Sequence, residues 1–260
     1  MTVKWAPPAL SAVRDAVKRL LGLLLILALS ACSSQDRATS PEEVRKLADS
    51  AQAQRSRKAA EDHLRTIVNA YAKNTPLILG LVTVNDLCAG GAAKQWFFQT
   101  GDDQYKIRCA MRITAYYGAD PHRIADVLDG ILTAGDHDSS DGAPGGTIPF
   151  HHGSHGSPLV DYYRGKAPNP PGQNAPEPAL LFDPSQTLSW DTVRSSERKL
   201  IDEPDPCPSN DPPVTRCLRE PASRTVADIR KKYGMVFKLE ISMINYYRVS
   251  KDGKIVHAWR

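Results

Sequence analysis

The chain has 260 residues, 41% of them hydrophobic, and a formal net charge of +4 at pH 7. This apolar fraction is sufficient for a packed core, which excludes an intrinsically disordered chain. The small net charge and the lack of a basic stripe interleaved with aromatic residues argue against a nucleic-acid partner.

The N-terminus has the pattern of a secretory signal. It begins with a basic segment that carries Lys4, Arg14, Lys18 and Arg19. The apolar run that follows, from Leu20 to Ala31, is shorter than the about 20 residues that a transmembrane helix needs. The order of basic segment, apolar core and small residues predicts cleavage, although an uncleaved N-terminal anchor is a second interpretation.

The run closes with Leu29-Ser30-Ala31-Cys32. These four residues resemble the lipobox of bacterial lipoproteins. The resemblance implies that residues 1–31 are a signal peptide and that Cys32 is lipidated and becomes the mature N-terminus. It also implies a second acylation, for example with palmitate, and several acyl chains anchor a protein stably. Residues 32–40 would then be a polar tether.

The expected location is the extracytoplasmic face of a cell membrane, with the lipid anchor as the membrane contact. In a two-membrane cell, Ser33 departs from the usual inner-membrane retention signal, which leaves the outer membrane open. Removing residues 1–31 removes four bases and one acid, so the mature chain has a net charge of only +1.

Four cysteines remain after Cys32, namely Cys88, Cys109, Cys207 and Cys217. An even number outside the cytoplasm favours disulfides, and pairing 88 with 109 and 207 with 217 closes the shortest loops. A four-thiolate zinc site is the alternative. It is disfavoured because the sequence has no Cys-x-x-Cys pair.

Two helices are predicted in the first half of the domain. Ser40-Pro41 with Glu43 predicts a helix start with a capping box, and apolar residues at helical spacing continue it to about residue 73. Asp120-Pro121 predicts a second helix that ends at Gly135.

Strand patterns follow each of these helices. Residues 77–87 predict a buried strand, and residues 94–100 with 104–117 predict a hairpin whose second arm alternates. Short strands are predicted at 159–163 and 187–193, and a helix at 225–233. Residues 235–249 predict a long strand that returns at 255–259 through the turn at Asp252-Gly253.

These elements predict an α+β fold with an antiparallel sheet of about five strands, packed by a long N-terminal helix and a second helix. The expected organisation is a single domain over residues 41–260, with long loops rich in proline and glycine near 136–186 and 202–221.

Histidines concentrate in the segment 136–157, where the candidate metal ligands are His137, His151, His152 and His155. Imidazole and carboxylate groups bind zinc, copper and nickel. The neighbouring glycines and serines instead favour a solvated loop that binds metal weakly at most, since a tight site needs fixed partners for each imidazole. A catalytic set of Ser154 or Ser157 with a histidine and an aspartate is a further alternative, although no Gly-x-Ser-x-Gly motif is present.

Two other sites come from the strands. Lys106, Arg108 and Arg112 lie on the polar face of the alternating arm, where they could hold an anionic ligand or simply be solvated. Trp96-Phe97-Phe98 favours strand core over a ligand platform.

The sequence thus favours a lipid-anchored envelope protein that binds a ligand or has a structural role, with no cofactor and no catalytic residue assigned. Its partner would be an envelope protein or a small molecule. The alternative is a membrane-tethered hydrolase or metal-binding protein that uses the histidine-rich loop 136–157.

Overall fold

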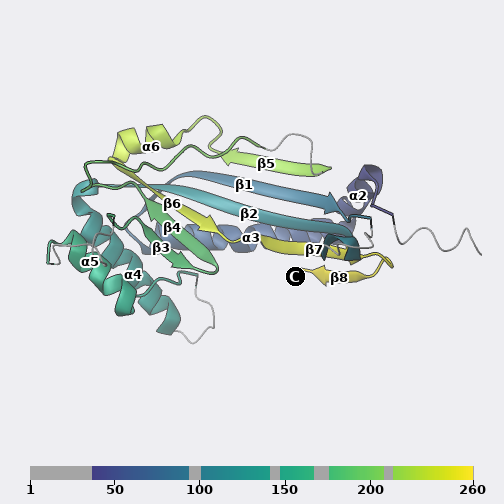
Figure 1. Ribbon diagram of the computed structural model, residues 1–260, viewed down its shortest axis with the longest axis horizontal. Helices are drawn as coiled ribbons and strands as arrows, with labels where there is room; N and C mark the ends of the chain where they lie inside the picture. Colours follow the sequence, from purple (N-terminus) through teal and green to yellow (C-terminus); the bar gives the residue numbers. More distant parts are fainter. Residues whose placement is uncertain (1–36, 94–100, 141–146, 167–175, 208–212, 260) are drawn as a thin grey trace, which may run out of the picture.

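The computed structural model describes residues 37–93, 101–140, 147–166, 176–207 and 213–259. These residues form one antiparallel sheet of eight strands with helices on both of its faces (Figure 1). The strands are β1 Ile78–Gly90, β2 Tyr105–Ala119, β3 Leu180–Asp183, β4 Gln186–Trp190, β5 Val214–Glu220, β6 Met235–Ile241, β7 Ile244–Ser250 and β8 Ile255–Ala258. The α-helices are α2 Pro41–Ala48, α3 Ala51–Asn74, α4 Ile124–Ser140, α5 Ser157–Tyr163 and α6 Val226–Tyr233.

The strand order is β3-β4-β6-β2-β1-β5, and β7 pairs with the other half of β2 and carries β8 at its outer edge. The α+β class with an antiparallel sheet is therefore confirmed, but the expectation of about five strands was too low. The additional strands are short edge pieces whose half-buried side chains produce no clear apolar period.

The predicted helix over residues 41–73 is two helices. Ser50 interrupts it: its backbone is extended, and its side-chain oxygen accepts a hydrogen bond from the Ala53 amide at 3.3 Å. Ser50 is thus the N-cap of α3, as Ser40 is the N-cap of α2. The carboxylate of Glu43 does not close a capping box but reaches Lys106 at 3.2 Å.

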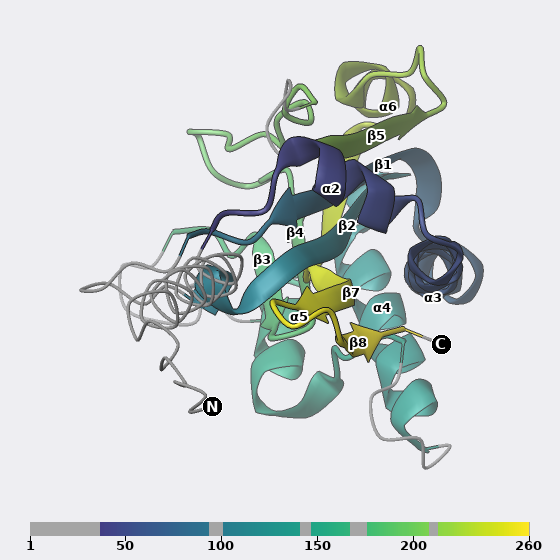
Figure 2. The ribbon, with the colours of Figure 1, turned by 90° about the vertical axis from the view of Figure 1, so that its right-hand side faces the viewer.

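Helix α3 packs along one face of the sheet, where Figure 2 shows it end-on beside the strands. The side chains predicted to form its packing face are all buried: Ala60, Leu64, Ile67, Val68 and Tyr71. The buried Tyr71 hydroxyl donates to the Gln186 side chain at 2.8 Å, which ties α3 to β4. Helices α4 and α5 complete this layer at the end of the molecule opposite α2 (Figure 1).

The predicted alternation of β2 is confirmed from Ile107 to Tyr117, whose inward side chains are fully buried. At its start the register against β7 shifts between Tyr105 and Ile107. The face of the sheet opposite α3 is called the outer face, and Arg248 lies on it. Tyr105 pairs with Ser250, which is two residues from Arg248 and therefore on the same face. The irregularity thus places Tyr105 on the outer face.

The predicted long strand over residues 235–249 is two strands that pair with successive halves of β2. A second register shift in β7 places Cys109 opposite Tyr247 and Ala110 opposite Asn245, so Tyr246 is an extra residue. Both Tyr246 and Tyr247 are therefore buried, although strict alternation would expose one of them. The return strand β8 and the turn before it are as predicted.

Helix α4 continues past Gly135, where the sequence predicted its end. Gly135 allows the helix to approach the following chain closely, because a Cβ there would lie 1.9 Å from the Phe150 carbonyl oxygen. Residues 159–163, predicted as a strand, belong to α5. Pro158 in the first turn of α5 and packing against α4 favour the helix.

The segment 202–221, predicted as a loop, contains β5, which pairs with β1 from Val82 to Cys88. On the same outer face, α6 covers Leu81, Tyr116 and Val236 in a second apolar cluster. The rest of this outer face, toward α2, is polar and is called the open face below.

The structure has the disulfides Cys88–Cys109 and Cys207–Cys217, the pairing favoured from the sequence. Cys88 and Cys109 are directly opposite each other on β1 and β2. Two disulfides indicate an oxidising, extracytoplasmic compartment. Among the residues that the structure describes, no helix is both long and apolar enough to span a bilayer.

Candidate functional site

The histidine-rich segment is partly helical and folds against α4. Asp136, His137 and Asp138 belong to α4, and residues 152–156 form a short helical turn that leads into α5. The sequence-based description of this segment as a floppy loop is therefore wrong for the described residues. It failed because the segment is fixed by contacts with α4 rather than by its own composition.

His152 bridges two carboxylates of α4. Its Nδ1 lies 2.6 Å from Asp136 Oδ2, and its Nε2 lies 3.1 Å from Asp129 Oδ1. The His152 amide also donates to Asp136 at 3.2 Å. Arg164 at the end of α5 pairs with Asp129 at 3.2 Å. Asp129 and Asp136 are seven residues apart, two turns of α4, so one face of the helix holds both.

These contacts set the protonation of the bridge. The hydrogen bond that Asp136 accepts raises the pKa of His152, and the bond to Asp129 adds to this effect. Partial desolvation of the ring acts in the opposite direction. Desolvation opposes ionisation of Asp136, but the hydrogen bonds from His152 lower the pKa of that carboxyl. Both carboxylates thus favour the imidazolium form of His152, in which each ring nitrogen can donate.

We expect this bridge to stabilise the protein mainly in mildly acidic solution. The contribution of Asp136 to the free energy of unfolding is present above the pKa of the unfolded carboxyl, about 4. The contribution of His152 is complete below the pKa of the unfolded imidazole, about 6.5, and is lost as pH rises through its pKa in the folded protein. His152→Gln should therefore lower stability at pH 5.5 by up to about 1 kcal/mol, because the groups are partly exposed. At pH 9 the deficit relative to wild type should shrink. Urea unfolding of wild type and variant at each pH measures the loss of stability. A loss at pH 9 equal to or larger than that at pH 5.5 would contradict the stabilising role of the protonated His152.

The other predicted ligands do not converge with His152 on one point. His151 Nδ1 lies 3.5 Å from Asp136 Oδ1, and His155 Nδ1 lies 3.0 Å from the hydroxyl of its neighbour Ser154. Ser157 donates to the His152 carbonyl oxygen, not to its ring. Within the described residues, no group of three or more His, Cys, Asp or Glu side chains has the arrangement of a metal site.

A surface groove of about 450 Å³ lies elsewhere, between α3 and β8. It is lined by Gln52, Arg55, Ser56, Ala59, Ala258 and Trp259. Its one hydroxyl, that of Ser56, donates to the Trp259 carbonyl oxygen at 2.9 Å. This lining brings together no histidine, nucleophile and carboxylate of the kind that acyl transfer needs.

The three bases predicted on the polar face of β2 have different environments. Lys106 pairs with Glu43, and Arg108 pairs with Asp102 at 3.2 Å. Arg112 is exposed and has no carboxylate partner in the described part of the chain. The sequence reasoning missed Arg248, which lies directly opposite Arg108 on β7. Because Tyr247 and Val249 are inward, the alternation of β7 was the sequence signal that places Arg248 on the polar face. The pairing with Arg108 required the strand register.

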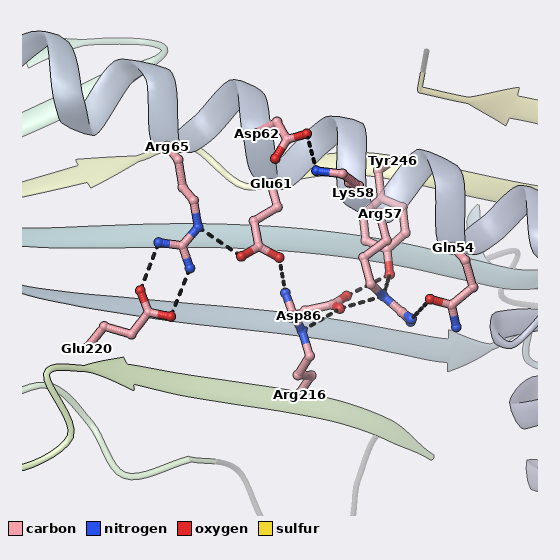
Figure 3. A network of polar contacts seen from close by, with 10 residues as sticks. All are labelled: Gln54, Arg57, Lys58, Glu61, Asp62, Arg65, Asp86, Arg216, Glu220 and Tyr246. Atoms are coloured by element: carbon pink, nitrogen blue, oxygen red, sulfur yellow. Dashed lines mark hydrogen bonds and ion pairs between the residues drawn. The ribbon is translucent and has the colours of Figure 1, made fainter.

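A buried ion network joins α3 to the sheet (Figure 3). Its centre is Asp86 on β1, which is 1% exposed. The Tyr246 hydroxyl donates to Asp86 Oδ1 at 2.6 Å. Arg57 Nε donates to the Tyr246 hydroxyl at 3.2 Å and forms an ion pair with Asp86, 2.7 Å from Oδ2.

The network continues along α3 toward the far end of β5. Arg216 lies between Asp86, at 3.5 Å, and Glu61, with which it forms an ion pair. Arg65 pairs with Glu61 at 2.9 Å and binds both oxygens of Glu220, at 2.8 and 3.1 Å. Three cations thus alternate with three anions, which neutralises the charge between helix and sheet. The spacing of Arg57, Glu61 and Arg65 by four residues was the sequence signal for this face.

The end of the tether is folded onto the domain. The Thr39 amide donates to the Gly91 carbonyl oxygen at 3.0 Å. Lys251 Nζ, in the turn between β7 and β8, donates to the carbonyl oxygens of Arg37 at 2.7 Å and Ala92 at 3.0 Å. A Cβ at Gly90 would lie 3.0 Å from the Thr39 carbonyl oxygen, so this close approach favours glycine there. The tether therefore reaches the domain at the α2 end of the sheet.

Two sets of predicted site residues, Cys32 with its lipobox and Trp96-Phe97-Phe98, lie outside the described residues. Comparisons with family models, with curated proteins and with solved structures found no match for this chain.

Proposed function

We propose that the protein is a lipid-anchored, extracytoplasmic envelope protein that acts by binding, with Cys32 as its membrane anchor. The docked tether is the observation that carries the proposal. Lys251 holds Arg37, the first residue that the structure describes, and only four residues separate Arg37 from the cysteine of the lipobox-like sequence. Both disulfides support an extracytoplasmic location.

The open face of the sheet is the surface that supports a binding role. Helices α3, α4 and α5 cover the opposite face of the sheet, and α6 covers the end of the outer face that lies beyond the open face. Arg108, Arg112 and Arg248 lie on the open face, which no described helix covers, and their charge favours an anionic ligand.

The alternative, a hydrolase or metal-binding protein that uses residues 136–157, has less support. A general base or a metal ligand needs an available ring nitrogen, whereas Asp129 and Asp136 occupy both nitrogens of His152. His155 contacts Ser154, its neighbour in sequence, and within the described residues no carboxylate orients its ring.

We expect Cys32→Ser to release the protein from the membrane fraction, because the apolar segment before it is too short to span a bilayer. Cell fractionation of wild type and variant, with mass spectrometry of the N-terminal peptide, measures the effect. Ser33→Ala, which leaves the cysteine in place, is the matched control and should stay in the membrane fraction. A Cys32→Ser protein as membrane-bound as wild type, together with no acyl adduct on wild-type Cys32, would reject the proposal.

A further inference from the structure

The open face carries a row of cationic and imidazole side chains across three strands. Arg108 on β2 is directly opposite Arg248 on β7, which in turn is opposite His257 on β8. Residues directly opposite in a sheet have Cβ atoms about 5 Å apart, and like charges at such positions destabilise the pairing. The two arginines are thus held together against their mutual repulsion.

The hydrogen bonding of this row is incomplete. Arg248 lies over the Tyr105 ring, 5.1 Å from its centroid, and donates to the Tyr105 hydroxyl at 3.0 Å, but it pairs with no carboxylate in the described residues. Arg248 Nε and His257 Nε2 are buried and have no hydrogen-bond partner there. Because the Arg248 guanidinium has no carboxylate partner among the described residues and lies opposite a second arginine, an anion from outside the chain would offset the repulsion of this pair.

Among the described side chains, one carboxylate contacts the arginine pair. Asp102 lies 3.2 Å from Arg108, and its side chain is 52% exposed. A carboxylate this exposed can rotate into solvent when a stronger anion arrives. A phosphate fits the remaining site well, because guanidinium groups bind its oxygens in a bidentate manner.

The position of the row in the molecule identifies the source of that phosphate. Tyr105 is opposite Ser250, and the next residue, Lys251, holds Arg37 at the end of the tether. From Cys32 to Arg37 is five residues, which span at most about 18 Å. Arg108 lies three residues further along β2, about 10 Å from Tyr105. The arginine pair is therefore within reach of the membrane that holds the anchor.

We propose that Arg108 and Arg248, with Tyr105 and His257, bind the phosphate of an anionic lipid headgroup in that membrane. This inference rests on the proposed anchor for the source of the ligand, but its test does not use the anchor. Binding of the headgroup would fix the orientation of the domain, because an anchor at one residue does not by itself define how the domain is rotated.

The test is co-sedimentation with lipid vesicles of the chain from Ser33 onward, which contains every described element. One set of vesicles contains phosphatidylglycerol and phosphatidylcholine, and the other contains phosphatidylcholine alone. Wild type should bind the anionic vesicles preferentially. The double variant Arg108→Gln, Arg248→Gln should lose affinity by about fivefold per arginine. Asp102→Asn should bind more tightly than wild type, because it removes the competing carboxylate.

The matched control is Arg55→Gln with Arg123→Gln, which removes the same charge from exposed positions on α3 and before α4. Its affinity for the anionic vesicles should stay within twofold of wild type, which corresponds to a difference in binding free energy of about 0.4 kcal/mol. Arg108→Gln alone, at a 46% exposed side chain, guards against misfolding of the double variant and should still weaken binding.

Three outcomes would overturn the proposal: no preference of wild type for anionic vesicles, equal losses in the two double variants, or full competition by millimolar glycerol phosphate, which would assign the site to a soluble phosphate. None of these outcomes affects the separate measurement of acylation at Cys32.

Discussion

Replacing Asp86 with alanine should lower the free energy of unfolding by about 3–5 kcal/mol, the usual cost of removing one partner from a buried ion pair. Asp86 is 1% exposed and is the acceptor for the Tyr246 hydroxyl and the partner of Arg57. Without it, Arg57 keeps a buried positive charge with no carboxylate at this position, and the Tyr246 hydroxyl loses its acceptor.

Urea unfolding of the oxidised protein measures this effect. Asp62→Ala is the control. Asp62 lies on α3 near the network, but its side chain is 59% exposed and forms a surface ion pair with Lys58. Its removal should cost less than about 1 kcal/mol. Similar unfolding midpoints for the two variants would show that the network contributes no more than a surface pair.

A chain that ends at Gly234 should fail to fold. It lacks β6, which lies between β4 and β2 in the sheet, and both strands that follow. Its loss detaches β3 and β4 and leaves β2 with an unpaired edge along its whole length. It also removes five large buried side chains: Phe237, Tyr246, Tyr247, Leu239 and Ile241.

The control for this truncation is a chain that ends at Lys254. It loses only the four-residue edge strand β8 and the residues after it, so it should remain soluble and unfold cooperatively. Thermal unfolding followed by circular dichroism compares the two. A cooperative transition of the shorter chain near that of the full-length protein would contradict the central position of β6.

Local sequence patterns determined several parts of this protein. The inward side chains of β2 recur every second residue and those of α3 at helical spacing, so the faces that pack were predicted. The Asp252-Gly253 turn predicted the last hairpin, since Gly253 has a positive φ of 86° there. Cysteine number and spacing favoured the disulfides found. Each of these signals depends on residues near one another in the chain.

Contacts between distant residues decided the rest. Tyr246 is buried because an extra residue in β7 turns it toward Asp86, 160 positions away in the sequence. His152 is fixed by two carboxylates of α4, a helix that ends at Ser140, whereas the glycines next to His152 in the sequence predicted a loop without fixed contacts.

The same reason applies to the arginine pair on the open face. Arg108 and Arg248 are 140 positions apart, and only the strand register of β2 and β7 places them opposite each other. The sequence by itself determined which segments are amphipathic and where the last turn occurs, and it favoured the cysteine pairing that the structure has. Register, irregular strand pairing and the burial of charge were decided by the tertiary structure, because a shift of one residue moves a side chain to the other face of the sheet.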